Sequence, residues 1–157
     1  MAAFKKYLCK TLLILVVSTM AAQANGQVKI RLKDYQWKHR LILAFSPSTE
    51  DPEYRAFAKE IAVQAEEVID RDILVFHILK TGEIKLGESS LQTGSGDYLR
   101  ERFSISPSAF TVLLIGKDGG VKLRREGRAK LDEIFSLIDT MPMRQREMKE
   151  KSHRGDN

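Results

Sequence analysis

The chain has 157 residues, of which 43% are hydrophobic and 30% charged, and its formal net charge is +5. This composition is that of a globular protein, and the length allows one domain that buries its core without covalent staples. The chain contains a single cysteine, Cys9, which excludes an internal disulfide framework and a cysteine-rich zinc site.

The first 24 residues have the three parts of a secretory signal. They are a basic start (Lys5, Lys6 and Lys10), an apolar run (Leu12–Val17) and small residues before a cleavage point (Ala22 and Ala24). The apolar segment is about twelve residues long, whereas a membrane span needs roughly twenty. We therefore expect cleavage after Ala24 and a secreted or periplasmic chain without a membrane span. Cleavage removes Cys9 and three lysines, which lowers the formal charge from +5 to +2.

Two continuous apolar runs, 40–45 and 73–79, predict strands that are buried on both faces. Between them, Asp51 and Pro52 form a helix start, and apolar residues recur every three or four positions as far as Ile69. This predicts one helix of about four turns. A strand, a helix and a strand with short connections form a right-handed unit with parallel strands.

Residues 80–96 are glycine-rich and polar, so we expect a long loop, followed by a short helix at 97–103. Strands at 110–115 and 121–125 flank the turn Gly116–Gly120 and predict a β-hairpin. Apolar residues from Leu131 to Met141 predict an amphipathic helix that stops before Pro142.

This order of elements predicts an α/β, thioredoxin-like fold. We expect a central mixed four-stranded sheet, made of a βαβ unit and a β-hairpin, with helices on both faces. The domain should cover residues 25–143. Residues 144–157 are charged and lack apolar periodicity, which predicts a disordered tail.

Four stretches of the chain also resemble a known family. They are Trp37–Phe45, Asp70–Asp72, Leu114–Leu123 and Ile138–Arg144. The pair Gly-Lys-Asp-Gly-Gly-Val-Lys and Met-Pro-Met-Arg, some twenty residues apart, is the most specific part. The chain is similar over residues 30–148 to the family named domain of unknown function 4174. This resemblance implies a peroxiredoxin-like fold, found in exported bacterial proteins and in modules of animal extracellular-matrix and sushi-repeat proteins. It implies a fold rather than a reaction.

The position of a reactive thiol is occupied by other residues. Thioredoxin-like enzymes place this thiol after the first strand, where the helix N-terminus stabilises the thiolate. Here that segment is Ser46–Pro52, which contains no sulfur. The cis-proline expected before the hairpin is also replaced, by Thr111 in an ungapped comparison. Thiol-disulfide exchange and cysteine peroxidase activity are therefore not expected of the mature chain.

A non-thiol site at the same helix N-terminus is an alternative. Its candidate residues are Ser46, Ser48, Thr49 and Arg71, and its candidate bases are His39 and His77. A hydroxyl nucleophile needs a base and a group that orients the base, and the sequence offers no such third member. The apolar neighbours of His77 favour a packed histidine.

The hairpin carries a second candidate site, a cationic patch of Lys117, Lys122, Arg124 and Arg125. Strand alternation predicts Lys122 and Arg124 on one face, where an anionic surface or another exported protein could bind. The alternative is an edge strand protected by charge against pairing. Nucleic acid is not expected, because export separates the chain from it and no aromatic platform accompanies the charge.

Cofactor and metal sites are not predicted. The three histidines lack the spacing of a zinc site, and the Gly116–Gly120 segment lacks the pattern of a phosphate loop. Met141–Arg144 is either a packed helix end or a surface element of the family. The tripeptide Arg154-Gly155-Asp156 matches an integrin-binding motif, but three residues are too few to assign binding.

The sequence thus favours an exported thioredoxin-like domain that binds a partner and does not catalyse a reaction. The alternative is an enzyme of another type with its site at the first helix N-terminus. An enzyme should have a concave polar site at the strand ends, whereas a binding module should have an exposed patch elsewhere.

Overall fold

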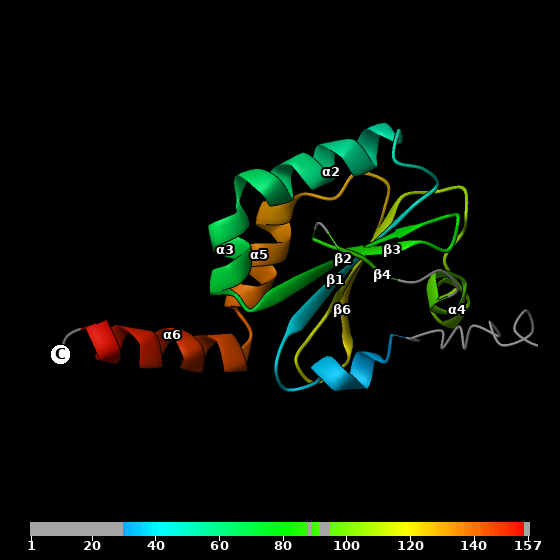
Figure 1. Cartoon of the computed structure of the whole chain (residues 1–157). Helices are drawn as coiled ribbons and strands as arrows, with labels where there is room; N and C mark the ends of the chain where they lie inside the picture. The colour runs from blue at the N-terminus through cyan, green and yellow to red at the C-terminus, as the bar shows by residue number, and fades with distance from the viewer. Residues whose placement is uncertain (1–29, 88, 92–94, 156–157) are drawn as a thin grey trace, which may run out of the picture.

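The computed structural model describes residues 30–87, 89–91 and 95–155. Its elements are η2 (Leu32–Tyr35), β1 (Arg40–Ser46), α2 (Pro52–Val63), α3 (Ala65–Asp70), β2 (Ile73–Leu79), β3 (Ile84–Leu86), β4 (Ser89–Leu91), α4 (Ser95–Arg102), β5 (Thr111–Ile115), β6 (Val121–Glu126), α5 (Leu131–Asp139) and α6 (Pro142–Gly155). The described strands form one mixed sheet in the order β4-β3-β2-β1-β5-β6 (Figure 1). This confirms the predicted α/β, thioredoxin-like class.

The predicted βαβ unit and hairpin form the centre of the sheet. β1 is parallel to β2, with Arg40 opposite Ile73 and Ser46 opposite Leu79. β5 pairs antiparallel with β1 on its other side and with β6 at the edge. All seven residues of β1 are buried, as the continuous apolar run predicts.

Helices cover both faces of the sheet. One face packs Ile42 and Ala44 against α2, α3 and α5, and the other packs Leu43 and Phe45 against η2 and α4 (Figure 1). The alternation of side chains along β1 therefore supplies both cores.

The first helix differs from the prediction. Asp51 caps it as expected, accepting a 2.9 Å hydrogen bond from the Tyr54 amide. However, the backbone of Gln64 leaves helical geometry at φ −107° and ψ 33°, which divides the helix into α2 and α3. The break changes the helical phase, so Ile69, predicted on the apolar face, is 72% exposed.

The segment predicted as a long loop contains two short strands. β3 pairs with β2, and β4 pairs with β3, which extends the sheet beyond the four predicted strands. Each strand has three residues, too few for a pattern of period two to stand out from chance. Ile84, fully buried, anchors β3 to the core of the η2 and α4 face.

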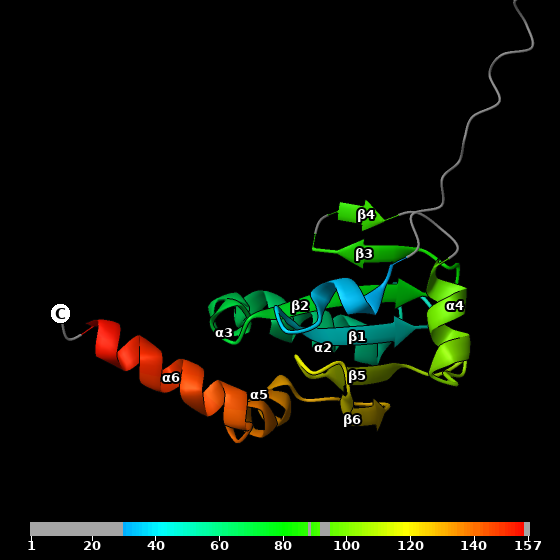
Figure 2. The same cartoon turned by 90° about the horizontal axis from the view of Figure 1, so that it is seen from below.

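The C-terminal segment also differs from the prediction. α5 ends at Asp139, before Pro142 as expected, but residues 142–155 form the helix α6 instead of a disordered tail. Pro142 begins this helix, a position at which its missing N–H costs nothing. Figure 2 shows α6 extending away from the body of the domain. Asp156 of the Arg154–Asp156 tripeptide lies outside the described residues.

Within the described residues, no helix is both long enough and apolar enough to cross a membrane. The predicted signal, residues 1–24, lies outside the described part of the chain, as does Cys9.

Candidate functional site

The hydroxyl groups after β1 are held by local hydrogen bonds. Ser46 is fully buried, and its Oγ donates to the Ser48 carbonyl at 2.7 Å. Ser48 Oγ accepts from the Glu50 amide at 3.2 Å, and Thr49 Oγ1 lies 3.4 Å from the Glu50 carboxylate. The hydroxyl hydrogen of Ser46 is thus bonded to a backbone carbonyl, and this bond fixes the loop. It is not directed at a base that could activate the hydroxyl as a nucleophile.

The candidate base His77 packs in the same layer as Tyr54. Their rings meet edge to face at 5.5 Å, and His77 Nδ1 is buried with no hydrogen-bond partner among the described residues. Burial lowers the pKa of His77, with a smaller contribution from Lys85. These features are those of a packed neutral histidine.

Arg71 lies at the opposite end of the sheet from Ser46. It precedes β2 and binds Asp139 at 2.6 Å, whereas Ser46 ends β1 opposite the last residue of β2. The candidate set Ser46, Ser48, Thr49 and Arg71 is therefore not assembled, because the length of β1 separates Arg71 from the three hydroxyls. The sequence-based prediction that Arg71 lies near the N-terminus of the first helix is therefore wrong, because Arg71 precedes β2.

Arg100 of α4 is the buried arginine near Ser46. Its guanidinium donates to the carbonyls of Ser46 at 2.7 Å and Ile78 at 3.1 Å, in the last residues of β1 and β2. Burial lowers the pKa of Arg100. Arg100, Asp97 and Glu101 line an open hollow of about 510 Å³. The two carboxylates disfavour an anionic ligand in this hollow. No local sequence pattern distinguishes Arg100 from the exposed arginines nearby, so its role was not predictable from the sequence.

The cationic patch is neutralised within the fold. Lys122 Nζ lies 2.6 Å from Asp118, Arg124 lies 2.8 Å from Glu126, and Arg125 pairs with Glu133. Lys117 is 9% exposed and binds Asp72 and Glu147, at 2.8 and 2.7 Å. The four side chains therefore do not form a surface of unpaired charge.

The hairpin register also separates two residues of this patch. Leu123 pairs with Leu114, but Val121 pairs with Ile115, so Lys122 is one extra residue in β6. Lys122 lines the same pocket as Leu137 of α5, while Arg124 donates to the Phe103 carbonyl, after α4, at 2.8 Å. They consequently face opposite sides of the sheet, and the prediction of a shared face is wrong.

The family-like stretches meet at the end of the sheet where β1 and β2 begin. We call residues 37–40, 70–72, 116–120 and 141–144 of these stretches the motif end. Hydrogen bonds join them: Trp37 N donates to the Lys117 carbonyl at 2.7 Å, and Arg40 donates to the Arg71 carbonyl at 2.8 Å. Arg144, 4% exposed, donates to the Asp70 carbonyl at 2.8 Å and also pairs with its carboxylate. The stretches are distant in sequence and form one surface in the fold.

Glu147 of α6 completes this network. It accepts from Arg40, which is 1% exposed, and from Lys117. Burial by itself would raise the pKa of Glu147, but the hydrogen bonds from these two cations outweigh it and lower the pKa. The same balance, with Arg71 and Arg144 as donors, lowers the pKa of Asp139. Glu147 thus fastens α6 to the start of β1 and to the hairpin, and Asp139 joins Arg144 of α6 to Arg71, which precedes β2.

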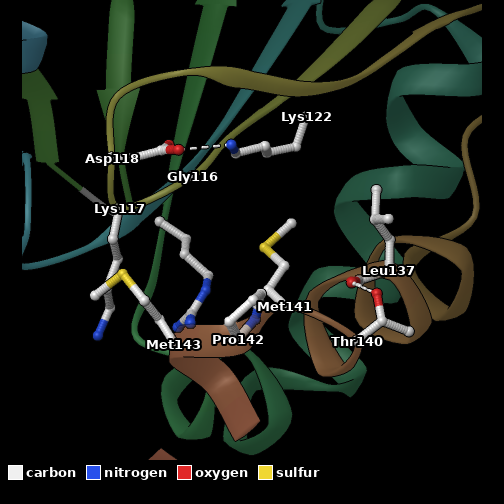
Figure 3. Close-up of a pocket in the computed structure, with 10 residues that line it drawn as sticks. Gly116, Lys117, Asp118, Lys122, Leu137, Thr140, Met141, Pro142 and Met143 are labelled. Carbon is white, nitrogen blue, oxygen red and sulfur yellow. Dashed lines mark hydrogen bonds and ion pairs between the residues drawn. The ribbon is translucent and has the colours of Figure 1, made fainter. Parts of the chain in front are cut away.

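A pocket of about 320 Å³ opens at the motif end. Its lining comes from Arg40, from the hairpin (116–118 and Lys122), from the end of α5 (Leu137 and Thr140) and from 141–143. Figure 3 shows the Lys122–Asp118 pair on one side of this space and Met141, Pro142 and Met143 on the other. Both halves of the most specific sequence motif therefore line the same pocket.

Residues 31–147 match the family described as Domain of unknown function (DUF4174). The chain belongs to the DUF4174 family. This confirms the resemblance inferred from the four stretches. The family match covers every segment of the motif end and stops at Glu147, the residue that joins α6 to Arg40 and Lys117.

The DUF4174 region is similar to a protein of Danio rerio named Coiled-coil domain-containing protein 80. The two are 29% identical over an alignment of 133 positions, and the alignment covers 74% of this chain and 15% of the relative. The chain thus spans a small part of that protein's length, and their similarity is that of one domain.

The solved structures that resemble this DUF4174 fold include a peroxiredoxin and a thioredoxin. The reduced 2-Cys peroxiredoxin of Plasmodium vivax has a TM-score of 0.56 and 12% identity, covering 74% of this chain and 85% of its own. The exposed lipoprotein thioredoxin of Streptococcus pneumoniae has a TM-score of 0.50 and 18% identity, covering 71% of this chain and 91% of its own. These similarities establish the fold.

Proposed function

We propose that this protein is an exported, non-catalytic binding module whose binding site is the motif end. The observation that carries the proposal is the meeting of three of the four family-like stretches around one pocket. The walls of the pocket come from segments that are far apart in sequence. A common surface for a partner accounts for such an arrangement more simply than a reaction does.

The opposite end of the sheet supports the same proposal. Residues 25–157 contain no cysteine, and the segment Ser46–Pro52 stands where thioredoxin-like enzymes carry a thiol. The Ser46 hydroxyl is buried and bonded to the Ser48 carbonyl. The nearby hollow is lined by Arg100, whose guanidinium binds backbone carbonyls. In the described part of the chain, these side chains hold the loops of this end in place, which supports a role other than catalysis.

The partner is another exported molecule or an anionic surface that reaches the pocket. The paired state of the hairpin cations argues against binding by unpaired charge alone. Apolar contacts with Met141, Pro142 and Met143 supply the additional free energy, because adaptable thioether side chains fit differently shaped ligands.

Photo-crosslinking at the two ends of the sheet tests this function. The full chain, exported by its own cells, would carry a photoreactive residue in place of Met143 at the motif end or of exposed Thr49 at the other end. We expect reproducible adducts from position 143 and none from position 49. Adducts from position 49 alone, or from neither position, would contradict the proposal. A parallel assay for dithiol and peroxide turnover should show no activity.

A further inference from the structure

The lining of the motif-end pocket combines apolar walls with an excess of positive charge. Leu137, Met141, Pro142 and Met143 form the apolar part. Three cations, Arg40, Lys117 and Lys122, line the pocket against one acid, Asp118. The acids that pair with Arg40 and Lys117, namely Glu147 and Asp72, are not part of the lining. A ligand inside this space thus meets more positive than negative groups.

Lys122 and Asp118 form the exchangeable part of the lining. Their side chains are 34% and 44% exposed, and the ion pair joins neighbouring residues of the hairpin. Exposed pairs of this kind contribute little free energy, so another carboxylate can replace Asp118 at Lys122 at small cost. By contrast, Arg40 and Lys117 are held from outside the pocket by Glu147. Lys122 is therefore the cation available to a ligand.

We propose that the pocket binds a small amphipathic monocarboxylate. Its carboxylate replaces Asp118 at Lys122, and its apolar body lies against Leu137, Met141 and Met143. The pocket volume of about 320 Å³ is at the lower end of the range for small-molecule sites, which suits a short alkanoate rather than a long acyl chain. This inference rests on the proposed function, because it names a ligand for the same site.

The length of the ligand's alkyl chain provides the first test. Butanoate, hexanoate and octanoate would be titrated into the full chain while the methyl resonances of Met141 and Met143 are followed by NMR, with Met148 of α6, which is not in the lining, as the internal reference. We expect affinity to increase about fourfold for each added methylene until the pocket is filled. Hexylamine should bind at least tenfold more weakly than hexanoate, because its charge is repelled by the lining.

Two substitutions test the exchange at Lys122. Lys122→Met removes the cation and keeps an apolar stem, and should weaken octanoate binding about tenfold or more. Asp118→Asn removes the competing carboxylate while its side-chain oxygen can still accept from the Gly120 amide, so it should tighten binding several-fold. Arg124→Gln, on the opposite face of β6, should leave the affinity unchanged.

The possible results separate this inference from the proposed function. If an amine or a neutral alcohol of equal length binds as well as the carboxylate, the ligand class is wrong, while binding at the pocket stands. If no probe shifts Met141 or Met143 at millimolar concentration, the ligand proposal fails, and the crosslinking experiment still decides whether the motif end binds a partner. If Asp118→Asn weakens octanoate binding, the exchange at Lys122 is refuted.

Discussion

Arg40 and Glu147 are 107 positions apart and form a bidentate ion pair, with distances of 3.0 and 3.2 Å between guanidinium and carboxylate. Arg40 begins the central strand β1 and is almost fully buried, while Glu147 belongs to α6. This pair therefore connects the last helix to the centre of the sheet. Lys117 joins it through the same carboxylate, at 2.7 Å.

Removing the Glu147 charge should loosen this connection. We expect Glu147→Gln to lower the free energy of unfolding by about 2 kcal/mol, because a charge-assisted bond to a buried guanidinium is replaced by a neutral one. Glu150→Gln, at an exposed position of the same helix, is the matched control and should have no effect beyond about 0.5 kcal/mol. Chemical denaturation measures both, and equal midpoints for the two variants would show that the pair contributes nothing to stability.

The stability of the fold should also decrease in acid, because protonation removes the charge of Glu147 and of the other paired carboxylates. The hydrogen bonds from Lys151 and Arg144 lower the pKa of Asp70, and the pKa values of Glu147 and Asp139 are also lowered. A carboxyl whose pKa is lower in the folded chain contributes stability above its unfolded value, near pH 4, and loses it as the pH falls through the folded value.

Urea unfolding between about pH 3 and 6 tests this dependence. The wild-type chain should lose stability as the pH falls below about 5. Glu147→Gln should show a shallower decrease, because one of the contributing carboxylates is absent. His77, whose pKa is lowered by burial, adds to the acid sensitivity of both proteins alike. Parallel curves for the two proteins would exclude Glu147 as a contributor.

Arg100 should stabilise the end of the sheet that carries Ser46. Arg100→Met leaves the buried carbonyls of Ser46 and Ile78 without this donor, so we expect a loss of about 3 kcal/mol in unfolding free energy. Arg102→Met, on the exposed side of the same helix, should cost less than about 0.5 kcal/mol. If both variants unfold at the same denaturant concentration, Arg100 does not have this role.

The hairpin turn provides a test with two adjacent glycines. Gly119 has a φ of +82°, whereas Gly120 lies outside the left-handed region. Gly119→Ala should therefore destabilise the chain by about 1 kcal/mol, and Gly120→Ala should be close to neutral. Thermal unfolding distinguishes them. Equal losses at the two positions would mean that side-chain crowding, and not the backbone angle, determines the cost.

The sequence predicted the centre of the fold well because its signals are local. The apolar runs of β1 and β2 and the glycine turn between β5 and β6 each lie within one stretch of chain. The helix break at Gln64 gave no such signal, since no proline or glycine marks it. The short strands β3 and β4 depend on pairing with β2, which periodicity does not reveal.

The candidate site was predicted only in its parts. Met141–Arg144 and the hairpin turn were both singled out, but their meeting around one pocket depends on the packing of α5 and α6. α6 was expected to be disordered because it lacks an apolar face, and ion pairs with Arg40, Lys117 and Asp70 hold it instead. Such pairs join residues far apart in the chain and leave no periodic pattern.

We propose that this thioredoxin-like domain binds its partner at the motif end and not at the end that carries Ser46. Single cysteines placed in a Cys9→Ser chain, at exposed Thr140 or exposed Thr49, allow a bulky maleimide to block either end. The measurement is the affinity for the partner identified by crosslinking. We predict at least a tenfold loss when position 140 is blocked and no change when position 49 is blocked. Loss of binding only when position 49 is blocked would contradict the account.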